Sequence, residues 1–219
     1  MIIHRRSTIP LLLLLAVSCH ERPRNNKSNF LPPDAKMVQT DLTDSLGKVA
    51  LAVPARYDTA FSWINHSDCG KPCDVQEYRY QPKLLPIKKE SGFFSLGEPK
   101  DSVDQLTISH SSDNQYNRVD SAKDPRTLQY AKLQLAQNPM NPPIIFDTIE
   151  KIGDRYFSII AMERSDTIQH KEVLAITTIK GNKIKFQYDL LTKKSDSITK
   201  DFIKNSIDLI RTIQITNGR

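Results

Sequence analysis

The C-terminal third of this 219-residue chain carries alternating apolar residues that are folded back by a tight turn. Val173 to Ile179 is rich in β-branched residues, and Lys180-Gly181-Asn182-Lys183 follows with two central residues that tolerate positive φ. Ile184, Phe186 and Tyr188 then alternate with polar residues, which is typical of a strand with one buried face. This pattern predicts an antiparallel hairpin, so the fold has to contain an antiparallel sheet.

Two further segments have the spacing of helices. Apolar residues between about Ser197 and Arg211 recur with a period near 3.6, which predicts a C-terminal helix. A shorter helix is predicted to begin at Pro125 and to end before Asn138-Pro139. Strands and helices without strict alternation favour the α+β class, in which a twisted antiparallel sheet is covered by the C-terminal helix and the second short helix is inserted. The remaining strand-like segments are approximately residues 49–53, 61–64, 75–80, 105–109, 144–152, 156–162 and 212–215.

The N-terminus has the order of an export signal. Arg5 and Arg6 precede an apolar run from Ile9 to Val17, and small Ser18 stands before Cys19. A basic start, an apolar run and a small residue at its end are typical of a secretory signal peptide. The run is far shorter than the roughly 20 apolar residues that a membrane-spanning helix needs, so we expect the mature protein to be soluble but tethered.

The segment Ala16-Val17-Ser18-Cys19 resembles the lipobox of bacterial lipoproteins. In that family cleavage falls before the cysteine, and the new N-terminal cysteine carries acyl chains, so the resemblance implies lipidation of Cys19. The residues that follow, His20-Glu21-Arg22, lack the acidic run that looks like a surface-export signal, which favours the cell envelope with an outer-membrane, periplasm-facing position. An ordinary cleaved signal or a short N-terminal anchor is the alternative.

The predicted organisation is a signal peptide over residues 1–18, a lipidated N-terminus and flexible tether over 19–46, and a single α+β domain over 47–219. Loss of Arg5 and Arg6 with the signal lowers the net charge from +6 to +4, and acidic residues interleave with the basic ones. Nucleic-acid binding needs a basic stripe, so nucleic acid is not an expected partner. The expected partners are the membrane, through the N-terminal lipid, and an envelope protein or a small ligand.

The other two cysteines, Cys69 and Cys73, lie four residues apart, with Gly70 and Pro72 between them to turn the backbone. This spacing can bring the two α-carbons within disulfide range, and an exported chain meets an oxidising compartment. We therefore predict a structural disulfide. The alternative is a metal or redox-active site built from His66, Cys69 and Cys73, because thiolate and imidazole together suit copper or zinc.

No catalytic constellation stands out in the sequence, and we expect neither a catalytic residue nor a cofactor. His110 lies in a Ser-His-Ser-Ser context, but no Gly-x-Ser-x-Gly turn accompanies it, so a hydrolase is a distant third hypothesis. Trp63, Tyr78 and Tyr80 lie on neighbouring predicted strands and form a candidate binding face. The alternative for these aromatic residues is cross-strand packing in the core.

Both ends of the predicted domain resemble PsbP-like domains. The run from Gly47 to Pro54 looks like that family's opening strand and proline, and the segments around Gly181 to Ile184, Asp201 to Ile203 and Ile210 to Ile213 are similar to its last hairpin and helix. The resemblance implies an α/β/α sandwich and an adaptor or binding role, with no catalytic set. The predicted function is that of a membrane-anchored exported lipoprotein with a non-enzymatic binding domain. A metal- or redox-handling exported protein is the alternative.

Overall fold

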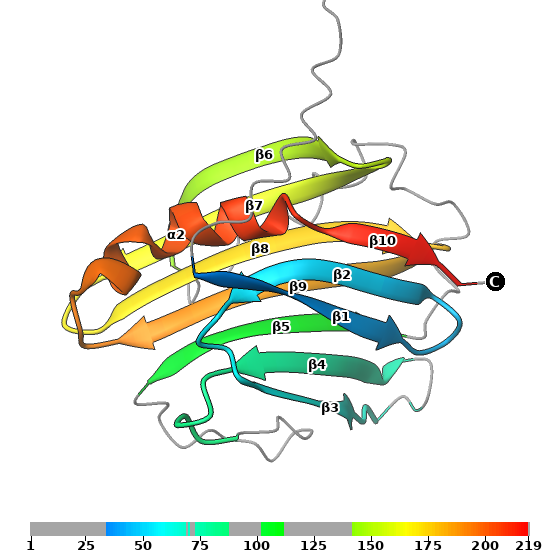
Figure 1. The fold of residues 1–219 in the computed structure, drawn as a ribbon, viewed down its shortest axis with the longest axis horizontal. Helices are drawn as coiled ribbons and strands as arrows, with labels where there is room; N and C mark the ends of the chain where they lie inside the picture. Colours follow the sequence, from blue (N-terminus) through cyan, green and yellow to red (C-terminus); the bar gives the residue numbers. More distant parts are fainter. Residues whose placement is uncertain (1–33, 69, 71–72, 88–101, 112–141, 219) are drawn as a thin grey trace, which may run out of the picture. The chain divides into compact units, whose positions relative to one another are not determined.

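The computed structural model describes residues 34–68, 70, 73–87, 102–111 and 142–218. Contacts divide the chain into a unit over residues 1–30, which lies outside the described residues, and a unit over residues 31–219. The described part of the second unit consists of ten strands and one α-helix, and its strands form two antiparallel sheets (Figure 1). The described protein is therefore mainly β.

The smaller sheet has three strands in the order β1-β2-β10, namely β1 (Ala35–Leu42), β2 (Gly47–Pro54) and β10 (Gln214–Asn217). β1 and β10 pair with opposite edges of β2, so strands from the two ends of the domain flank one central strand. Gly47 has a φ of 104°, and a Cβ there would clash with the carbonyl oxygen of Thr216. The close approach of β10 therefore requires glycine at the start of β2.

The larger sheet has seven strands in the order β3-β4-β5-β9-β8-β7-β6, and all neighbouring pairs are antiparallel. The predicted C-terminal hairpin is confirmed by the antiparallel pairing of β8 with β9, but its turn lies one residue earlier than predicted, with φ values of 49° at Lys180 and 82° at Gly181. The bounds are β3 (Thr59–Asn65), β4 (Val75–Gln81), β5 (Val103–Ser111), β6 (Ile144–Ile152), β7 (Arg155–Ser165), β8 (Gln169–Ile179) and β9 (Asn182–Thr192).

The helix α2 (Ser197–Ile210) begins at a polar cap and buries one face. The Oδ1 atom of Asp196 accepts a hydrogen bond from the backbone N–H of Thr199 at 3.0 Å, which satisfies one donor of the first turn. Phe202 and Ile210 lie on the buried face. No helix of the described residues is long and apolar enough to cross a membrane.

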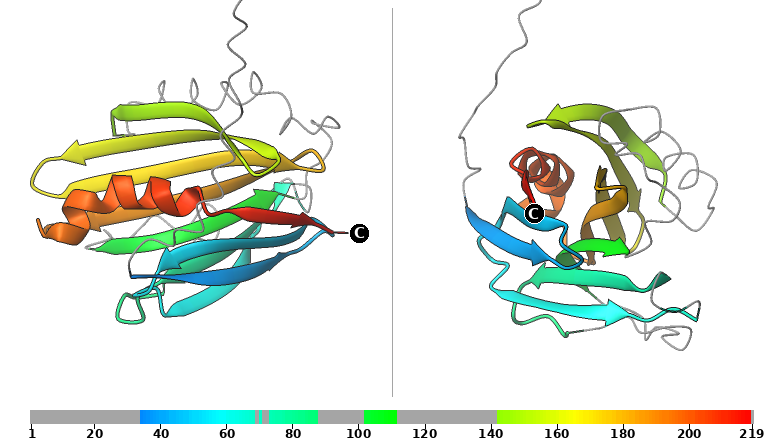
Figure 2. Two further views of the ribbon diagram at one scale, coloured as in Figure 1. Left: turned by 45° about the horizontal axis from the view of Figure 1, so that its top comes forward. Right: turned by 90° about the vertical axis from the view of Figure 1, so that its right-hand side faces the viewer.

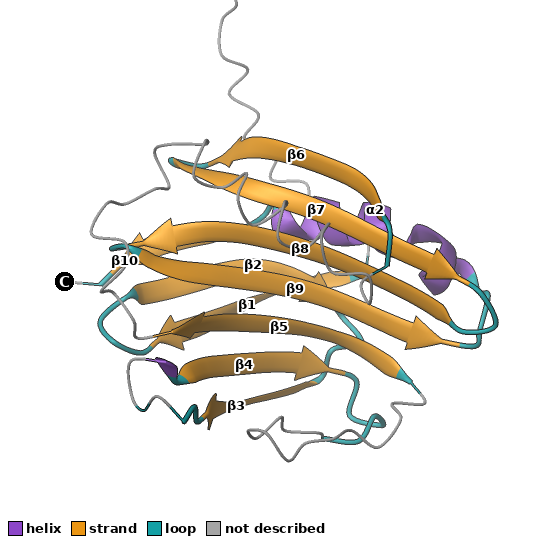
Figure 3. Cartoon of the chain, turned by 180° about the vertical axis from the view of Figure 1, so that it is seen from behind, coloured by secondary structure: helices purple, strands orange, loops and turns teal. Residues whose placement is uncertain are grey.

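α2 and the smaller sheet lie side by side on one face of the larger sheet (Figures 2 and 3). The main core lies between these two layers and includes Leu51 of β2, Phe186 of β9 and Phe202 of α2. The hydroxyl of Tyr188 in β9 donates a hydrogen bond across the core to the backbone oxygen of Ala52 in β2, at 3.1 Å. Apolar burial and this interior hydrogen bond together hold the layers in register.

The predicted α+β fold, with one sheet, a covering helix and an inserted helix, is wrong for the described residues. They form two sheets, and they contain one helix. The predicted helix from Pro125 lies outside the described residues. β1 also precedes Gly47, where the first strand was expected. Alternation of apolar residues identifies a strand but not its partner, and β2 has its two partners at opposite ends of the domain.

Candidate functional site

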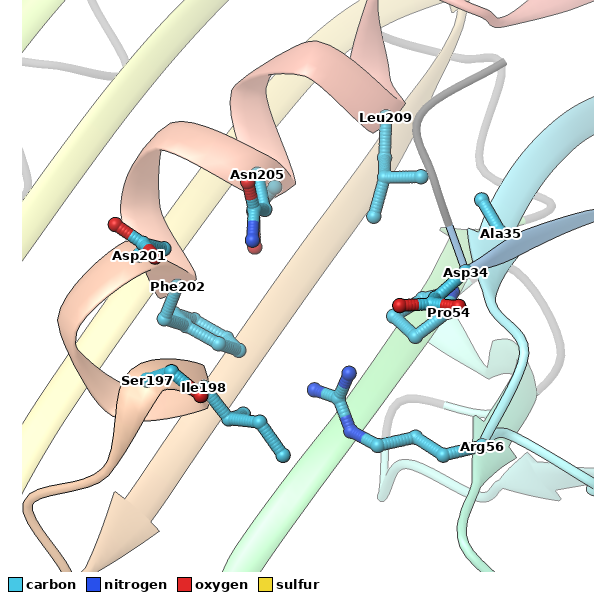
Figure 4. Close-up of a pocket in the computed structure, with 11 residues that line it drawn as sticks. Asp34, Ala35, Pro54, Arg56, Ser197, Ile198, Asp201, Phe202, Asn205 and Leu209 are labelled. Atoms are coloured by element: carbon cyan, nitrogen blue, oxygen red, sulfur yellow. The ribbon is translucent and has the colours of Figure 1, made fainter.

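A cavity of about 210 Å³ opens between α2 and the place where β1 begins and β2 ends. Figure 4 shows Arg56 reaching into this cavity from just beyond β2, opposite Phe202 of α2. We call this cavity the α2 groove. Its lining comprises Asp34, Ala35, Pro54, Arg56, Ser197, Ile198, Asp201, Phe202, Asn205, Ser206 and Leu209.

Arg56 is held in place by a carboxylate from a strand of the other sheet. Its Nε donates to Oδ2 of Asp104 at 2.7 Å, and its Nη2 donates to Oδ1 at 3.0 Å. Oδ1 of Asp104 also accepts a hydrogen bond of 2.6 Å from the hydroxyl of Tyr57. A bidentate pair of this kind fixes the plane of the guanidinium. Nη1 of Arg56, which these contacts leave unused among the described residues, is its remaining donor nitrogen.

The protonation states in this cluster follow from burial and charge. Burial and the Asp104 carboxylate raise the pKa of Tyr57 well above its ordinary value, so the hydroxyl stays protonated and acts as a donor. Burial lowers the pKa of Arg56, but the hydrogen bond to Asp104 and nearby negative charge outweigh that effect and raise it. The cluster is therefore a fixed ion pair with a protonated phenol behind it.

The α2 groove combines an apolar floor with a charged rim. Phe202 and Leu209 are buried members of the main core, and Pro54 closes the opposite side. Asp201 on α2 places an exposed carboxylate on the rim across from Arg56, and Asp34 places another on the same side as Arg56, next to Pro54. Ligand cavities for drug-sized molecules usually measure about 300–1,000 Å³, so this one suits a smaller group, such as a side chain of a partner protein or a small ligand.

A second titratable cluster lies on the opposite face of the larger sheet. Glu172 of β8 stands directly across from Asp189 of β9, and both alternate with residues that face the main core. Burial and the Asp189 charge raise the pKa of Glu172 to about 7. Nε2 of His170 lies 3.3 Å from Oδ1 of Asp189, and this interaction raises the pKa of the imidazole. No group of three His, Cys, Asp or Glu side chains in the described residues could hold a metal ion.

The structure does not bring the three predicted aromatic residues to one face. Tyr78 and Tyr80 share the core face of β4, as their alternation predicted, and both are buried there. The Tyr80 hydroxyl lies 2.6 Å from Oγ1 of Thr40 in β1. Trp63 is opposite Glu77 in the β3–β4 pair and therefore points to the other face, where the Arg79 guanidinium lies 4.6 Å from its ring centre. The tyrosines thus connect the two sheets.

His66, the histidine of the alternative metal or redox site, has a local partner. Nδ1 of His66 lies 3.0 Å from Oδ2 of Asp74 on the protein surface. Cys69 lies outside the described residues, so neither its pairing with Cys73 nor a metal site with His66 is tested; Cys19 and its lipid lie outside them too.

His110 is buried beside Tyr78. Its Nε2 is 3.3 Å from Oγ1 of Thr43 and 3.5 Å from the Tyr78 hydroxyl. Burial lowers the pKa of His110 despite the nearby charge of Asp44. This histidine therefore belongs to the packing between the β1–β2 turn and the larger sheet.

Sequence reasoning missed the residues that shape the α2 groove. Arg56 and Tyr57 follow the strand that ends at Pro54, and Asp104 stands at the start of β5, 48 residues beyond Arg56. Charged residues near strand ends are common on protein surfaces, so nothing local distinguishes them. The sequence offered two features: the basic and aromatic residues Arg56 and Tyr57 shortly after Pro54, and the acidic residue Asp104 just before the strand predicted over residues 105–109.

Comparison with known proteins gives a distant structural likeness. No family model matches the sequence, and no curated protein matches it. The solution structure of cyanobacterial PsbP (CyanoP) from Synechocystis sp. PCC 6803 superposes with a TM-score of 0.42 and 12% sequence identity. The match covers 83% of this chain and 94% of that one. The neighbour is of the kind that the ends of the domain resemble, but a likeness this distant implies neither function nor ligand for this chain.

Proposed function

We propose that this chain is a membrane-anchored exported lipoprotein whose folded domain binds a partner without catalysing a reaction. The support for the anchor is the order of basic start, apolar run and Cys19, with the signal peptide over residues 1–18. Lipid on Cys19 would keep the domain in the cell envelope, on the periplasm-facing side of the outer membrane. The disulfide between Cys69 and Cys73 belongs to the same proposal, because it requires an oxidising compartment.

The binding site in this proposal is the α2 groove. The observation that carries it is the Arg56–Asp104 pair, which holds a cation rigidly at the mouth of a cavity with an apolar floor. A preorganised charged group loses less conformational entropy on binding than a mobile one. Apolar surface from Phe202 and Leu209 supplies the non-directional part of the attraction. The groove is therefore built to receive a defined group.

The occupant that fits best is an apolar side chain of an envelope protein, flanked by polar groups. A cavity of about 210 Å³ holds a group of that size. The carboxylates of Asp34 and Asp201 favour a basic or amide neighbour on the partner, and Nη1 of Arg56 favours a carbonyl or carboxylate. A free small ligand with the same three features would occupy the groove in the same way.

The alternative function, a metal- or redox-handling protein, depends on His66, Cys69 and Cys73. No observation among the described residues favours it, because His66 pairs with Asp74. Two titratable thiols in the mature protein, or copper or zinc retained through purification, would be needed to support it.

Site-specific photo-crosslinking in the intact cell envelope tests the groove. A photo-reactive benzoylphenylalanine replaces Asp201 on the groove rim, and in a matched control it replaces Lys204, which is exposed on the same helix outside the groove lining. We expect a product of discrete mass from position 201 and not from position 204. Asn205→Trp, which fills the groove from an exposed position, should lower the yield about tenfold, equivalent to roughly 1.4 kcal/mol of binding.

Two results of this experiment would contradict the proposal that partners bind in the α2 groove. Equal product patterns from positions 201 and 204 would mean that partners touch α2 without using the groove. A yield from position 201 that is unchanged by Asn205→Trp would also remove the groove from the proposal. Circular dichroism and thermal melting of each variant confirm that the fold is retained.

A further inference from the structure

Exposed apolar side chains gather at one end of the domain. Leu84 is 98% exposed and Ile87 is 57% exposed in the segment after β4, Ile168 is exposed in the β7–β8 turn, and Ile198 is exposed in the first turn of α2. We call these four residues the apolar end. Single exposed apolar residues are normal on a protein surface, but a group of them at one end marks an interaction site.

The register of the strands places these residues at a common end. Thr59 at the start of β3 pairs with Gln81 at the end of β4, so the segment with Leu84 lies at the end of the sheet where β2 finishes and β1 begins. Figures 1 and 2 show the first turn of α2 and the β7–β8 turn at this same end. Ile145 and Phe146, also exposed, lie near the start of β6 at this end.

The chain that leads to Cys19 leaves the domain at this end as well. Asp34 is the first described residue, and it stands directly before β1. Only 15 peptide steps separate Cys19 from Asp34, and an extended chain spans at most about 3.6 Å per residue, which gives a reach of about 50 Å. A lipid on Cys19 would therefore hold the start of β1, at the apolar end, within about 50 Å of the bilayer, but it would not by itself decide which end of the domain faces the membrane.

The charges at this end suit a lipid headgroup region. Lys83 is next to Leu84, and Lys193 and Lys194 precede α2, all three of them exposed. Their ammonium groups can meet lipid phosphates, while Asp166 and Asp196 keep the end from being strongly basic. Attachment would therefore depend mainly on the apolar side chains, with lysines as a secondary contribution.

We propose that the apolar end rests on the bilayer surface, with Leu84 and Ile87 inserted among the lipid headgroups. This inference depends on the proposed lipidation of Cys19. One lipid-modified residue and one inserted loop together fix the orientation of the domain, which a tether alone leaves free. Because Ile198 lines the α2 groove and also belongs to the apolar end, a partner bound in the groove would lie at the membrane surface.

Tryptophan quenching by brominated lipid tests the insertion in the full lipidated protein. The chain has a single tryptophan, Trp63, so wild type supplies the baseline. Leu84→Trp adds a reporter at the apolar end, and Ile64→Trp adds one at a 48% exposed position in β3, away from that end. In vesicles of phosphatidylethanolamine and phosphatidylglycerol that contain brominated-chain phosphatidylcholine, the emission added by Leu84→Trp should fall by roughly half, whereas that added by Ile64→Trp should not change.

Vesicle flotation and intact-mass measurement distinguish failure of the inserted apolar end from failure of the proposed lipid anchor. If the protein floats with the vesicles and carries lipid on Cys19, but the two reporters are quenched equally, the inserted end is refuted and the anchor stands. If Cys19 is unmodified and the protein does not float, the proposed function falls together with the inserted end. Leu84 makes little contact with the rest of the domain, so its replacement should leave the fold intact.

Discussion

Replacing Asp104 with Ala should destabilise the domain by about 3 kcal/mol. The substitution removes three hydrogen bonds at once, those from Nε and Nη2 of Arg56 and that from the Tyr57 hydroxyl. Tyr57 is fully buried, and a buried hydroxyl left without an acceptor costs about 1–3 kcal/mol. The Arg56 side chain is 33% exposed, so its guanidinium can bind water when Asp104 is removed. The loss of its hydrogen bonds to Asp104 therefore belongs at the low end of the range of about 1.5–3 kcal/mol for a charged hydrogen bond.

The loss can be measured by urea and thermal unfolding of the mature protein, followed by circular dichroism. For a domain of this size each kcal/mol shifts the Tm by about 2–4 °C, so Asp104→Ala should lower it by about 6–12 °C. The urea midpoint should fall while the slope m stays constant, which identifies a change in stability alone. Asp104→Asn keeps one acceptor oxygen and should lie between wild type and Asp104→Ala.

A matched surface pair provides the control. Asp41, which is 71% exposed, lies 3.1 Å from Nζ of Lys48. Asp41→Ala should change stability by no more than about 0.5 kcal/mol, because exposed ion pairs contribute little. If Asp104→Ala lowers the free energy of unfolding by less than about 1 kcal/mol, Asp104 does not hold Arg56 in place. The inference that Arg56 is rigid at the opening of the α2 groove would then be wrong.

Two further predictions concern titration and thiols. Glu172 has a pKa of about 7 in the fold against an ordinary value of 4.5, so its contribution to stability is present below pH 4.5 and is lost as the pH rises through 7. Glu172→Gln should remove this fall in melting experiments between pH 4 and 8, and identical pH profiles for the two proteins would contradict the raised pKa. If Cys69 and Cys73 pair and Cys19 carries lipid, as proposed, thiol titration of the denatured, non-reduced mature protein should find no free thiol; two titratable thiols would contradict the disulfide.

Local signals were enough to predict individual elements. The hairpin turn was predicted from Gly181 and Asn182, which tolerate positive φ; the structure has the turn one residue earlier, with positive φ at Lys180 and Gly181 and Asn182 already paired with Ile179. The helix predicted to begin near Ser197 does so and ends within one residue of the expected position, because its cap and its apolar period lie within the segment itself. Tyr78 and Tyr80 share one face for the same reason, since side chains alternate along any strand.

Assembly of the elements depended on information that the local pattern lacks. The division into two sheets follows from the pairing of β2 with β1 and β10, and the pattern of β2 alone is compatible with many partners. Trp63 was expected beside Tyr78, but its pairing with Glu77 turns it to the opposite face. The α2 groove was missed because Arg56 follows a strand of the smaller sheet and Asp104 lies in a strand of the larger sheet, so the two residues meet only in the folded chain.

The central position of β2 in the smaller sheet has a consequence for biogenesis. Its outer partner β10 is formed by Gln214–Asn217, and the backbone N–H of Ala52 donates to Oγ1 of Thr212, 160 residues later. If the chain is exported from its N-terminus, as proposed, it cannot complete this sheet until Gln214–Asn217 has emerged. Closure of so distant a contact is slow, so during export one edge of β2 would stay unpaired and would need a chaperone to shield it.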